Sequence, residues 1–533
     1  MAIKVGGTEV VDNNRQLKNI ASVDATTVTA LGAAGIGGGG SALEATADGN
    51  ISIGDFVTLN SNGTVSSINV QNVLSSLSSA WTTSTTIWYN DMIYLTARQK
   101  FIVVYRDSTN NYGMAVAGSF SGTTISWDTP VVVASENAYY QTICDQGIYE
   151  GRDDFLFSWS NYSNNGRASI LRATHSGSQF NFGNRNYISA NGGYDMSLAF
   201  SGGINGWVCV YRDANDSYKA YYRIISRVGS GTTISIGSGN AAIYSTQADT
   251  VALTSCGETN VVAMIADRSS NPKKVVGVVL SPTSANFVNV GSVQTIVSGN
   301  TTTDVQQGLA VTGTKKNIDT NGQTVAGNGE KRTHAVLIPD YNGALRIIPF
   351  YVTGTTINLG SAIQVTSSTS GDCDIGWDEI NGRYLVINSG QIYLYKPNAG
   401  TAATPSVSLE TSFGGNGVGS QYNAVADMHV FDAGYANNTL GQAWVGNSKK
   451  GQYVSASSNV ANYIGCASEA TSSGSTAKIL VLGGISENQS FLTTNSTYYI
   501  DDQGNISTNA VSGREIGKAL NSTKLLLTTS GIT

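Results

Sequence analysis

A short pattern of apolar and polar positions recurs along this chain. Residues 101–107, FIVVYRD, form an apolar run that ends in a polar residue, and a polar turn (STNNYG) and a second apolar segment (114–119) follow. An unbroken apolar run of this length predicts a strand that is buried on both faces. Asn, Ser, Asp and Gly in the turn favour a hairpin, because they tolerate left-handed backbone or bond their own main chain.

The polar residue at the end of the run marks each copy of the pattern. It returns about every 50 residues, at Asp107, Asn161, Asp213, Asp267, Asp340, Asn388 and Asp432. A further strand pair follows several of the hairpins, as in GTTISWDTPVVV and GTTINLGSAIQV. Four short strands in a repeat of this length predict the blade of a β-propeller. The chain is therefore predicted to be all-β, with a propeller of six or seven four-stranded blades over residues 87–457.

Three further parts flank the predicted propeller. Residues 1–40 are short β-prone pieces that end in a Gly-rich linker, GAAGIGGGG, and they lack the apolar content to form a core of their own. Residues 41–86 read as a small β unit and a linker, and residues 458–533 as a C-terminal β module. Within the propeller, the polar stretch 312–333 is predicted to be a surface excursion.

The composition narrows the functional classes. Hydrophobic residues make up 41% of the chain and charged residues only 12%, which is typical of a folded, turn-rich β protein. A net charge of −6 argues against binding to nucleic acid or to an anionic membrane. The start of the sequence has no secretory pattern, and no apolar run is long enough to span a membrane, so membrane insertion is not expected.

The cysteines and histidines give no sign of a metal or a cofactor. The five cysteines are odd in number and widely spaced, which predicts buried thiols instead of disulfides or metal ligands: Cys144, Cys209, Cys256, Cys373 and Cys466. The three histidines show no metal-ligand spacing. No metal site and no cofactor are predicted.

The carboxylates do not predict catalysis. The polar residues that end the repeated runs sit where Asp and Asn accept hydrogen bonds from turn amides. The acidic pairs Asp153–Asp154, Asp378–Glu379 and Asp501–Asp502 are neighbours in sequence, so in a strand their side chains would point to opposite faces. We expect such pairs to be solvated in loops. No catalytic residue is predicted, and the protein is not expected to be an enzyme.

Tyrosine is the residue type that points most directly to a ligand. The chain has 26 tyrosines, and several fall in or beside the hairpin turns: Tyr112, Tyr162, Tyr218, Tyr341 and Tyr435. Rigid aromatic rings among Asn, Ser and Gly suit stacking on sugars together with hydrogen bonds to hydroxyl groups. The alternative is that these rings only cover the outer edges of the blades. The five tyrosines are the candidate receptor-binding residues.

Both ends of the chain resemble a known class of protein. Residues 3–20, IKVGGTEVVDNNRQLKNI, look like the leader of tail-fibre proteins of marine tailed bacteriophages of the cyanophage or pelagiphage kind. Residues 43–68, LEATADGNISIGDFVTLNSNGTVSSI, are similar to units that precede the body of such fibres. The segments NYIGCASEA, TAKILVLGG and SGREIGKALNSTKLLL are similar, in this order, to the C-terminal module of phage fibres.

The resemblance implies a structural virion protein, namely a tail fibre that mediates adsorption to the host surface. Such a protein is made in the host cytoplasm and resides on the virion. Its partners would be other virion proteins, held through the leader, and a host surface glycan or protein. The apolar leader residues are the candidates for virion anchoring: Val5, Val10, Val11, Leu17 and Ile20.

Two alternatives to a tail fibre stay open. The protein could be a head-decorating or vertex fibre, or a tail-assembly component, without a receptor. It could also be a glycan depolymerase on a propeller scaffold.

Self-association is also expected. The apolar leader residues lack an evident partner within the chain, and so do Ile479, Val481, Leu525, Leu526 and Leu527 near the C-terminus. Burying identical patches against symmetry mates would cover them. A homotrimer is expected only because fibres of this kind are commonly threefold.

Overall fold

The computed structural model divides into two compact units, Asn72–Ala456 and Met1–Gln71 with Ser457–Thr533. It describes residues 3–5, 8–11, 42–68, 70–74, 78–82, 87–95, 98, 100–121, 124–145, 154–161, 166–190, 192–229, 231–237, 241–257, 259–269, 273–301, 309–312, 334–341, 344–367, 373–378, 383–388, 391–397, 405–414, 429–430, 440–445, 451–500, 504–510 and 513–528. Strands dominate these residues, and their helices are three 3₁₀ turns: η3 (Gly202–Ile204), η4 (Ala214–Asp216) and η5 (Val460–Asn462). The all-β prediction is confirmed.

Seven antiparallel sheets make up the described part of the larger unit, and six of them use only strands that are consecutive in the chain. The first sheet contains β7 (Ile87–Leu95), β8 (Lys100–Asp107), β9 (Gly113–Ser121), β10 (Thr124–Trp127) and β11 (Val131–Ala134). The second contains β12 (Ala138–Asp145), β13 (Asp154–Asn161), β14 (Arg167–Ser176), β15 (Gln179–Phe182) and β16 (Asn186–Ser189). The third contains β17 (Gly193–Ser201), β18 (Gly206–Asp213), β19 (Lys219–Arg227), β20 (Ile234–Ile236) and β21 (Ala242–Tyr244). The fourth contains β22 (Ala248–Cys256), β23 (Asn260–Asp267), β24 (Lys273–Ser284), β25 (Phe287–Val290) and β26 (Gln294–Thr301). The fifth contains β27 (Ala310–Thr312), β28 (His334–Tyr341), β29 (Ala344–Thr353), β30 (Thr356–Leu359) and β31 (Ile363–Thr366). The sixth contains β32 (Cys373–Asp378), β33 (Arg383–Asn388), β34 (Gln391–Pro397) and β35 (Val407–Gly414).

The seventh sheet joins two distant parts of the chain. Its order is β36 (His429–Val430), β37 (Leu440–Val445), β38 (Gly451–Ser458) and β6 (Val70–Leu74). The sequence analysis assigns the region of β6 to a linker, and the structure corrects this assignment. The partner strand of β6 lies at the other end of the larger unit, so no local pattern in the sequence reveals the pairing.

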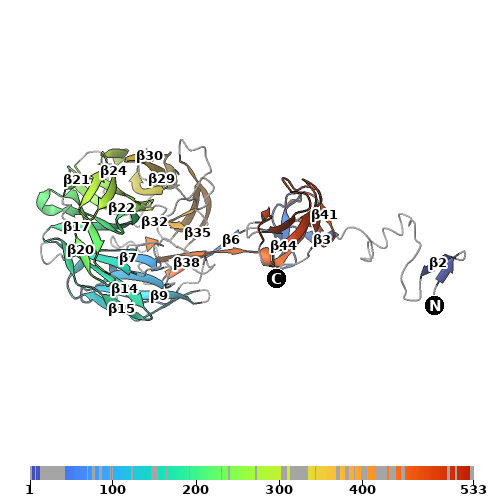
Figure 1. Cartoon of the computed structure of the whole chain (residues 1–533), viewed down its shortest axis with the longest axis horizontal. Helices are drawn as coiled ribbons and strands as arrows, with labels where there is room; N and C mark the ends of the chain where they lie inside the picture. The colour runs from blue at the N-terminus through green and yellow to red at the C-terminus, as the bar shows by residue number, and fades with distance from the viewer. Residues whose placement is uncertain are drawn as a thin grey trace. The chain divides into compact units, whose positions relative to one another are not determined.

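The sheets are arranged around a common centre (Figure 1). The first strand of each sheet contacts the first strand of the next, in the order β7, β12, β17, β22, β27, β32 and β36, and β36 contacts β7 again. These seven first strands therefore form a closed ring, and the remaining strands of each sheet lie outside it. In all seven sheets the second strand runs antiparallel to the first.

In six of the seven sheets the second strand is the apolar run that repeats in the sequence. The seventh sheet departs from the prediction, because the run expected to end at Asp432 forms β36, the first strand, through His429 and Val430. β8, β13, β18 and β23 are buried along almost their whole length. Five apolar clusters fill the spaces between consecutive sheets of the larger unit. One of them joins Ile102 and Val104 of the first sheet to Phe155, Phe157 and Leu171 of the second. A strand with a core on both faces has no solvated side, which explains why apolar and polar residues do not alternate along these runs.

A backbone hydrogen bond connects each of the first three hairpin turns to the next sheet. In the first turn, the Asp107 carboxylate accepts a hydrogen bond from the Thr109 amide (3.0 Å), as predicted for a polar residue at the end of a strand. The turn ends at Asn111, whose φ is 61° and whose carbonyl accepts a hydrogen bond from the amide of Ala138, the first residue of β12 (3.0 Å). Gly166 and Tyr218 make the equivalent bonds to Gly193 (2.7 Å) and Ala248 (2.9 Å).

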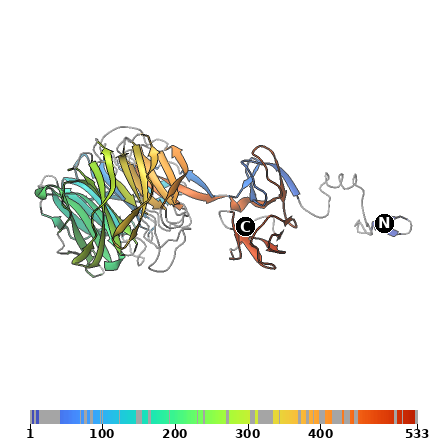
Figure 2. The ribbon, with the colours of Figure 1, turned by 90° about the horizontal axis from the view of Figure 1, so that it is seen from above.

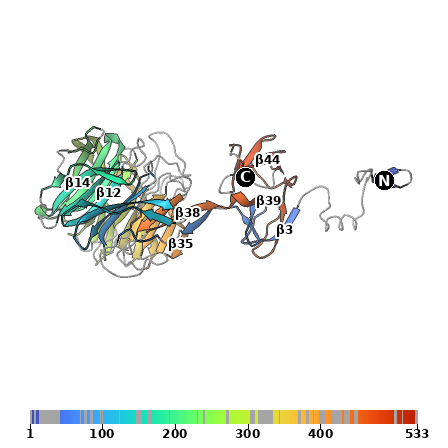
Figure 3. The ribbon, with the colours of Figure 1, turned by 90° about the horizontal axis from the view of Figure 1, so that it is seen from below.

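The smaller unit combines residues from both ends of the sequence (Figures 2 and 3). One sheet has the order β3 (Ala42–Thr46), β40 (Thr476–Leu480), β39 (Tyr463–Ala467), β4 (Phe56–Leu59) and β5 (Val65–Ser67). A second has the order β41 (Ile485–Ser486), β45 (Leu525–Leu527), β44 (Glu515–Ala519), β42 (Thr497–Ile500) and β43 (Ile506–Ser507). The sequence analysis places these strands in two separate parts, 41–86 and 458–533, whereas the structure makes them one unit.

This shared unit removes one reason for expecting self-association. Ile479, Leu525 and Leu527 are buried inside the chain, where Ile479 packs in a cluster with Val57 and Val65. Leu525 and Leu527 pack in the cluster that contains Phe56 and Ile68. The apolar positions near the C-terminus thus have partners within the same chain. The expectation of self-association then depends on the apolar leader residues alone.

Four of the five cysteines are buried as predicted: Cys209, Cys256, Cys373 and Cys466. Cys144 is half-buried. Burial raises the pKa of the Cys209 thiol, and it raises that of Cys466 to about 11. Because the thiolate is the reactive form, these two thiols are poor nucleophiles in the folded protein.

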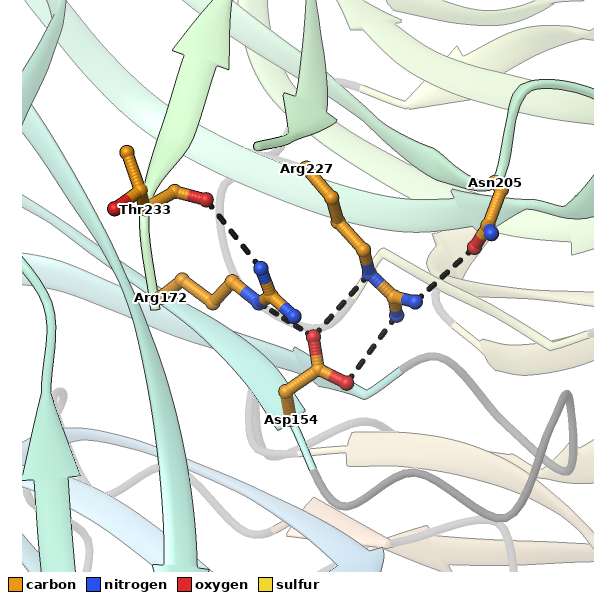
Figure 4. A network of polar contacts seen from close by, with 5 residues as sticks. All are labelled: Asp154, Arg172, Asn205, Arg227 and Thr233. Atoms are coloured by element: carbon orange, nitrogen blue, oxygen red, sulfur yellow. Dashed lines mark hydrogen bonds and ion pairs between the residues drawn. The ribbon is translucent and has the colours of Figure 1, made fainter. Parts of the chain in front are cut away.

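A buried polar network joins the second sheet to the third (Figure 4). One oxygen of the Asp154 carboxylate lies 2.5 Å from Nε of Arg172 and 3.2 Å from Nε of Arg227. Arg172 also donates to the carbonyl of Thr233 (3.3 Å), and Arg227 to Oδ1 of Asn205 (3.1 Å). The sequence analysis expects Asp154 to be solvated, but its side chain is only 3% exposed. This carboxylate pairs with two guanidinium groups at a sheet boundary and offsets one of their two positive charges.

Replacing Asp154 by Asn should strongly destabilise the larger unit. Asp154→Asn keeps the shape of the side chain but leaves two buried guanidinium groups without their counter-charge, and we expect a loss of about 3–5 kcal/mol in the free energy of unfolding. Urea unfolding, followed by tryptophan fluorescence, measures this loss. Asp216→Asn is the control, because Asp216 forms an ion pair with Lys219 at the surface of the third sheet. Equal unfolding midpoints for the two variants would contradict the prediction.

Candidate functional site

The first strands of four successive sheets begin with an irregularity at the same place. The pairing register shifts between Trp88 and Asp91 in β7, between Tyr139 and Thr142 in β12, between Tyr194 and Ser197 in β17, and between Ala248 and Thr250 in β22. Each shift is a β-bulge, which redirects the side chains next to it. All four bulges lie at the end of the ring where the hairpin turns are, and we call this end the mouth.

Three of the bulges hold a non-glycine residue with a left-handed backbone. The φ angles are 50° at Tyr89, 49° at Tyr140 and 41° at Asp195. A side chain in this region costs on the order of 1–3 kcal/mol, and such strain is concentrated at binding sites and active sites. Strain at equivalent positions of three neighbouring sheets therefore marks the mouth as a candidate site.

Four tyrosines form a cluster at the mouth, which we call the tyrosine cluster: Tyr89, Tyr139, Tyr140 and Tyr194. The ring of Tyr89 lies 5.2 Å from that of Tyr139 and 5.1 Å from that of Tyr140, between centroids. Tyr140 meets Tyr194 edge to face at 6.1 Å. The four side chains are half-buried, so each combines a fixed ring with a surface open to solvent. The cluster spans the first three sheets.

Arg106 connects the tyrosine cluster to two amide side chains. Its guanidinium lies over the ring of Tyr139, 4.1 Å from the centroid. Nη2 of Arg106 also contacts Oδ1 of Asn111, Oδ1 of Asn137 (3.1 Å) and the hydroxyl of Tyr139 (3.2 Å). A guanidinium held in this way is a fixed positive charge beside aromatic rings.

Three buried polar atoms at the mouth have no hydrogen-bond partner among the described residues: Nδ2 of Asn90, Nε of Arg106 and Oε1 of Gln141. Asn90 and Gln141 occupy equivalent bulge positions, directly after Tyr89 and Tyr140. An unpaired buried donor or acceptor costs about 1–3 kcal/mol. All three residues belong to the mouth, which makes them candidates for hydrogen bonds to a polar ligand.

A cavity of about 320 Å³ lies between the first strands. Gln141 lines it, together with hydroxyl and carboxylate side chains such as Asp91, Ser197, Thr254 and Asp374. Asp91 accepts hydrogen bonds from the hydroxyl of Thr142 (2.7 Å) and the amide of Ile143 (2.9 Å), which ties β7 to β12. The cavity could hold one small polar group, such as a single sugar ring.

A chain of charges continues the site between the third and fourth sheets. Arg212 forms an ion pair with Asp195, and its Nη1 lies 3.9 Å from Oδ1 of Asp249. Arg268 lies 3.8 Å from the same oxygen of Asp249. Burial raises the pKa of the Asp195 carboxyl to about 6; the charge of Arg212 partly opposes this rise, and that of Asp249 adds to it. The raised pKa moves the titration of Asp195 toward neutral pH.

Two of the five predicted receptor-binding tyrosines can be placed in full. Tyr112 is half-buried, and its carbonyl accepts a hydrogen bond from the Asp107 amide (2.9 Å). Tyr218 has a φ of 57° and lies 5.5 Å from the Arg212 guanidinium, measured to the ring centroid. The backbone of Tyr341 pairs with Ala344 at the end of β28. Tyr162 and Tyr435 lie outside the described residues.

The leader residues can be placed only in part. β1 (Ile3–Val5) and β2 (Thr8–Val11) form a hairpin in which Val5 pairs with Thr8 and Val11 pairs with Ile3, and Val10 lies in β2. Leu17 and Ile20 lie outside the described residues. The hairpin is a two-stranded sheet of its own.

The tyrosine cluster was not predicted from the sequence. The predicted tyrosines lie in or beside the hairpin turns, whereas the cluster lies at the beginning of the first strands. The available signal was an aromatic residue followed by a polar one at the start of successive repeats: WYND (88–91), YYQT (139–142) and YDMS (194–197). Nothing in these strings reveals the bulge or the left-handed backbone that brings the rings together.

No group of three or more His, Cys, Asp and Glu side chains among the described residues is arranged to hold a metal ion. In the same part of the chain, no helix has the length and the apolar character needed to cross a lipid bilayer.

Comparison with known proteins gives only distant likenesses. No protein-family model matches the chain, and no curated protein does. Among solved structures, the chain is similar to BP39L lectin from Burkholderia pseudomallei (11% identity, TM-score 0.46, covering 68% of this chain and 96% of the lectin). It is also similar to AofleA from Arthrobotrys oligospora (8%, 0.37, 66% and 93%) and to Sqt1 from Chaetomium thermophilum (8%, 0.41, 72% and 99%).

The raised pKa of Asp195 should make stability depend on pH. The ordinary value is 3.8 and the folded value is about 6, so between these pH values the folded state binds more protons than the unfolded state. The free energy of unfolding should therefore fall as the pH rises from 4 to 6, by on the order of 2–3 kcal/mol from this group. Asp195→Asn should lack this fall. Urea unfolding of both proteins across this range tests the prediction, and parallel pH profiles would refute it.

Proposed function

We propose that the larger unit binds a glycan at the mouth, with the tyrosine cluster as the platform on which a sugar ring stacks. The observation that carries the proposal is the coincidence of three features at one end of the ring. They are the clustered tyrosines, the left-handed backbone that positions two of them, and the buried amide groups without partners. A sugar has apolar C–H faces and hydroxyl groups, and the mouth offers surfaces for both.

The contacts assign a role to each part of the mouth. Half-buried tyrosines supply rigid area at a low cost in side-chain entropy. Arg106, Asn90 and Gln141 supply directed donors and acceptors beside these rings. Stacking rings beside directed polar groups suit the binding of a sugar, and we therefore propose that the larger unit is a binding protein.

We also propose that the ring of sheets is a seven-bladed β-propeller. Support comes from the cyclic contacts among the seven first strands. The pairing of β6 with β38 supports it as well, since the seventh sheet then takes strands from both ends of the larger unit. A ring completed in this way leaves no open edge between the first and last sheets.

At the level of the whole protein, we propose a tail fibre of a marine tailed phage, with the mouth as its host-binding surface. The support is the resemblance of the leader and of the C-terminal segments to phage fibres. A head-decorating or tail-assembly role remains the alternative within this class. A homotrimer is proposed on the same resemblance.

A glycan depolymerase is the second candidate, and one observation favours it. Glycoside hydrolysis uses a carboxyl with a raised pKa near a second carboxylate, and Asp195 near Asp249 fits that description. Arg212 contacts both carboxylates, however, and so occupies the space between them. Release of reducing sugar from host polysaccharide, abolished in Asp195→Asn, would identify this activity.

Truncating the central ring of the cluster should weaken glycan binding. Tyr140→Ala removes the ring that contacts both Tyr89 and Tyr194, and we expect a loss of about 2 kcal/mol in binding free energy, or roughly thirtyfold in Kd. The probe is the best binder from an array of immobilised oligosaccharides, measured by surface plasmon resonance.

Tyr499→Ala is the matched control, because Tyr499 is a half-buried tyrosine of the smaller unit. Its Kd should stay within about twofold of the wild-type value. Equal losses in the two variants, or no loss in Tyr140→Ala, would refute the proposed site.

The leader should be needed for attachment to the virion but not for folding. Its described residues form a two-stranded hairpin, which is at best marginally stable alone. A chain that lacks residues 1–40 should therefore keep the unfolding midpoint of the full chain and fail to copurify with phage particles. Calorimetry and immunoblotting of purified particles measure the two effects. Recovery of the truncated chain on particles would contradict the anchoring role.

A further inference from the structure

A second polar cluster lies at the outer part of the second sheet, on the hairpin side. Tyr187 in β16 is 44% exposed. The guanidinium of Arg167, at the start of β14, lies 4.9 Å from the centroid of the Tyr187 ring, and that of Arg185 lies 5.2 Å from it. Nη2 of Arg185 also donates to the hydroxyl of Tyr187 (2.9 Å). Two positive charges thus flank one exposed aromatic ring.

Glu136 holds Arg185 in place from the loop before β12. Its carboxylate accepts hydrogen bonds from Nη1 of Arg185 (2.5 Å), Nε1 of Trp159 (2.6 Å) and Nδ2 of Asn161 (2.6 Å). Burial opposes ionisation of Glu136, but these donors hold its pKa below the ordinary value. With three donors on its two oxygens, Glu136 stays charged and fixes the position of Arg185.

The charge of Arg167 is not neutralised in the same way. Arg167 is half-buried, and no carboxylate pairs with it among the described residues. Hydrogen bonds from Arg185, and in part from Arg167, lower the pKa of the Tyr187 hydroxyl, although the slight burial of this group opposes the change. The cluster therefore carries two guanidinium groups against one carboxylate, in a chain whose net charge is −6.

We propose that Arg167, Arg185 and Tyr187 form a binding site for an acidic saccharide, separate from the tyrosine cluster. The ring of Tyr187 offers an exposed face to the C–H groups of a sugar, and Arg167 offers its fork of donors to the carboxylate of a uronic acid. The proposal extends the proposed glycan binding by naming a charged class of sugar. Glu136 is a positioning residue in this site.

The position of the site fits a ligand longer than one sugar. Glu136 is followed in the chain by Asn137, which accepts a hydrogen bond from Arg106 at the mouth. The loop before β12 thus contributes one residue to each site. A chain of sugars that stacks at the mouth could present an acidic unit to Arg167.

The test measures binding of the full chain to three immobilised polymers: polygalacturonate, its carboxyl-reduced form, and dextran sulfate. The wild-type protein should bind polygalacturonate about tenfold more tightly than the reduced polymer, and Arg167→Gln should lose this preference. Arg346→Gln is the matched control, because Arg346 is a half-buried arginine on the third strand of the fifth sheet. It should keep the preference to within about twofold.

Each outcome decides the proposal. Binding of dextran sulfate with the same dependence on Arg167 supports an anionic site that also accepts sulfate. Equal binding of polygalacturonate and its reduced form, or an unchanged preference in Arg167→Gln, overturns the site. Unfolding midpoints show whether each variant is folded, and Glu136→Gln, which loosens Arg185 and leaves Arg167 intact, should weaken the preference only partly.

The test distinguishes a failure of the Arg167 site from a failure of the tyrosine cluster at the mouth. Tyr140→Ala should reduce the affinity for both forms of the polymer and leave the acidic preference intact. Loss of the preference in Tyr140→Ala, with no change in Arg167→Gln, would place the anionic group at the tyrosine cluster and overturn this inference alone. No effect of Tyr140→Ala on any polymer would overturn the proposed mouth site and leave the Arg167 comparison valid.

Discussion

The hydrogen bond between a hairpin turn and the next sheet determines much of this structure. The carbonyls of Asn111, Gly166 and Tyr218 each accept the first amide of the following sheet, at 2.7 to 3.0 Å. For the carbonyl to face outward, the residue that carries it adopts a left-handed backbone, with φ of 61°, 69° and 57°. The starts of β12, β17 and β22 are therefore fixed by the turn of the sheet before each of them. Since the mouth consists of these strand starts, its geometry depends on the turns.

The same bond explains why the mouth can hold strained residues. The bulges of β12 and β17 begin at the second residue of each strand. The hydrogen bonds to the carbonyls of Asn111 and Gly166 hold the backbone of the first residue in place, just before each bulge. Gly166 also leaves room for the site, because a Cβ there would lie 2.4 Å from the ring of Tyr194. The turns thus set the entry of each strand and make space for the tyrosines. Strain at Tyr140 persists because the surrounding sheet overdetermines its backbone.

The sequence predicts those features that depend on local pattern. The apolar runs such as FIVVYRD are the buried second strands, and Asp107, Asp213 and Asp267 cap their turns as expected. Features that depend on distant pairing were not predictable: β6 completes the seventh sheet, and Ile479 finds its core partners in β4 and β5. The tyrosine cluster needed a third kind of information. The sequence around Tyr89 and Tyr140 carries no sign of a bulge. Only the folded strands, with their register shifts, bring the two rings into contact.

Buried polar groups near the two ends of β13 serve different purposes, with stability at one end and binding at the other. At its first residue, Asp154 pairs with Arg172 and Arg227, and the network binds two sheets together. Near its last residue lies the mouth, where Asn90, Arg106 and Gln141 each keep a buried atom without a partner among the described residues. Both arrangements bury polar groups in a chain with only 12% charged residues. The Asp154 carboxylate meets both guanidinium groups within the fold, whereas the three atoms at the mouth can gain a partner only from a ligand or from water. The difference therefore assigns the Asp154 end to stability and the Gln141 end to recognition.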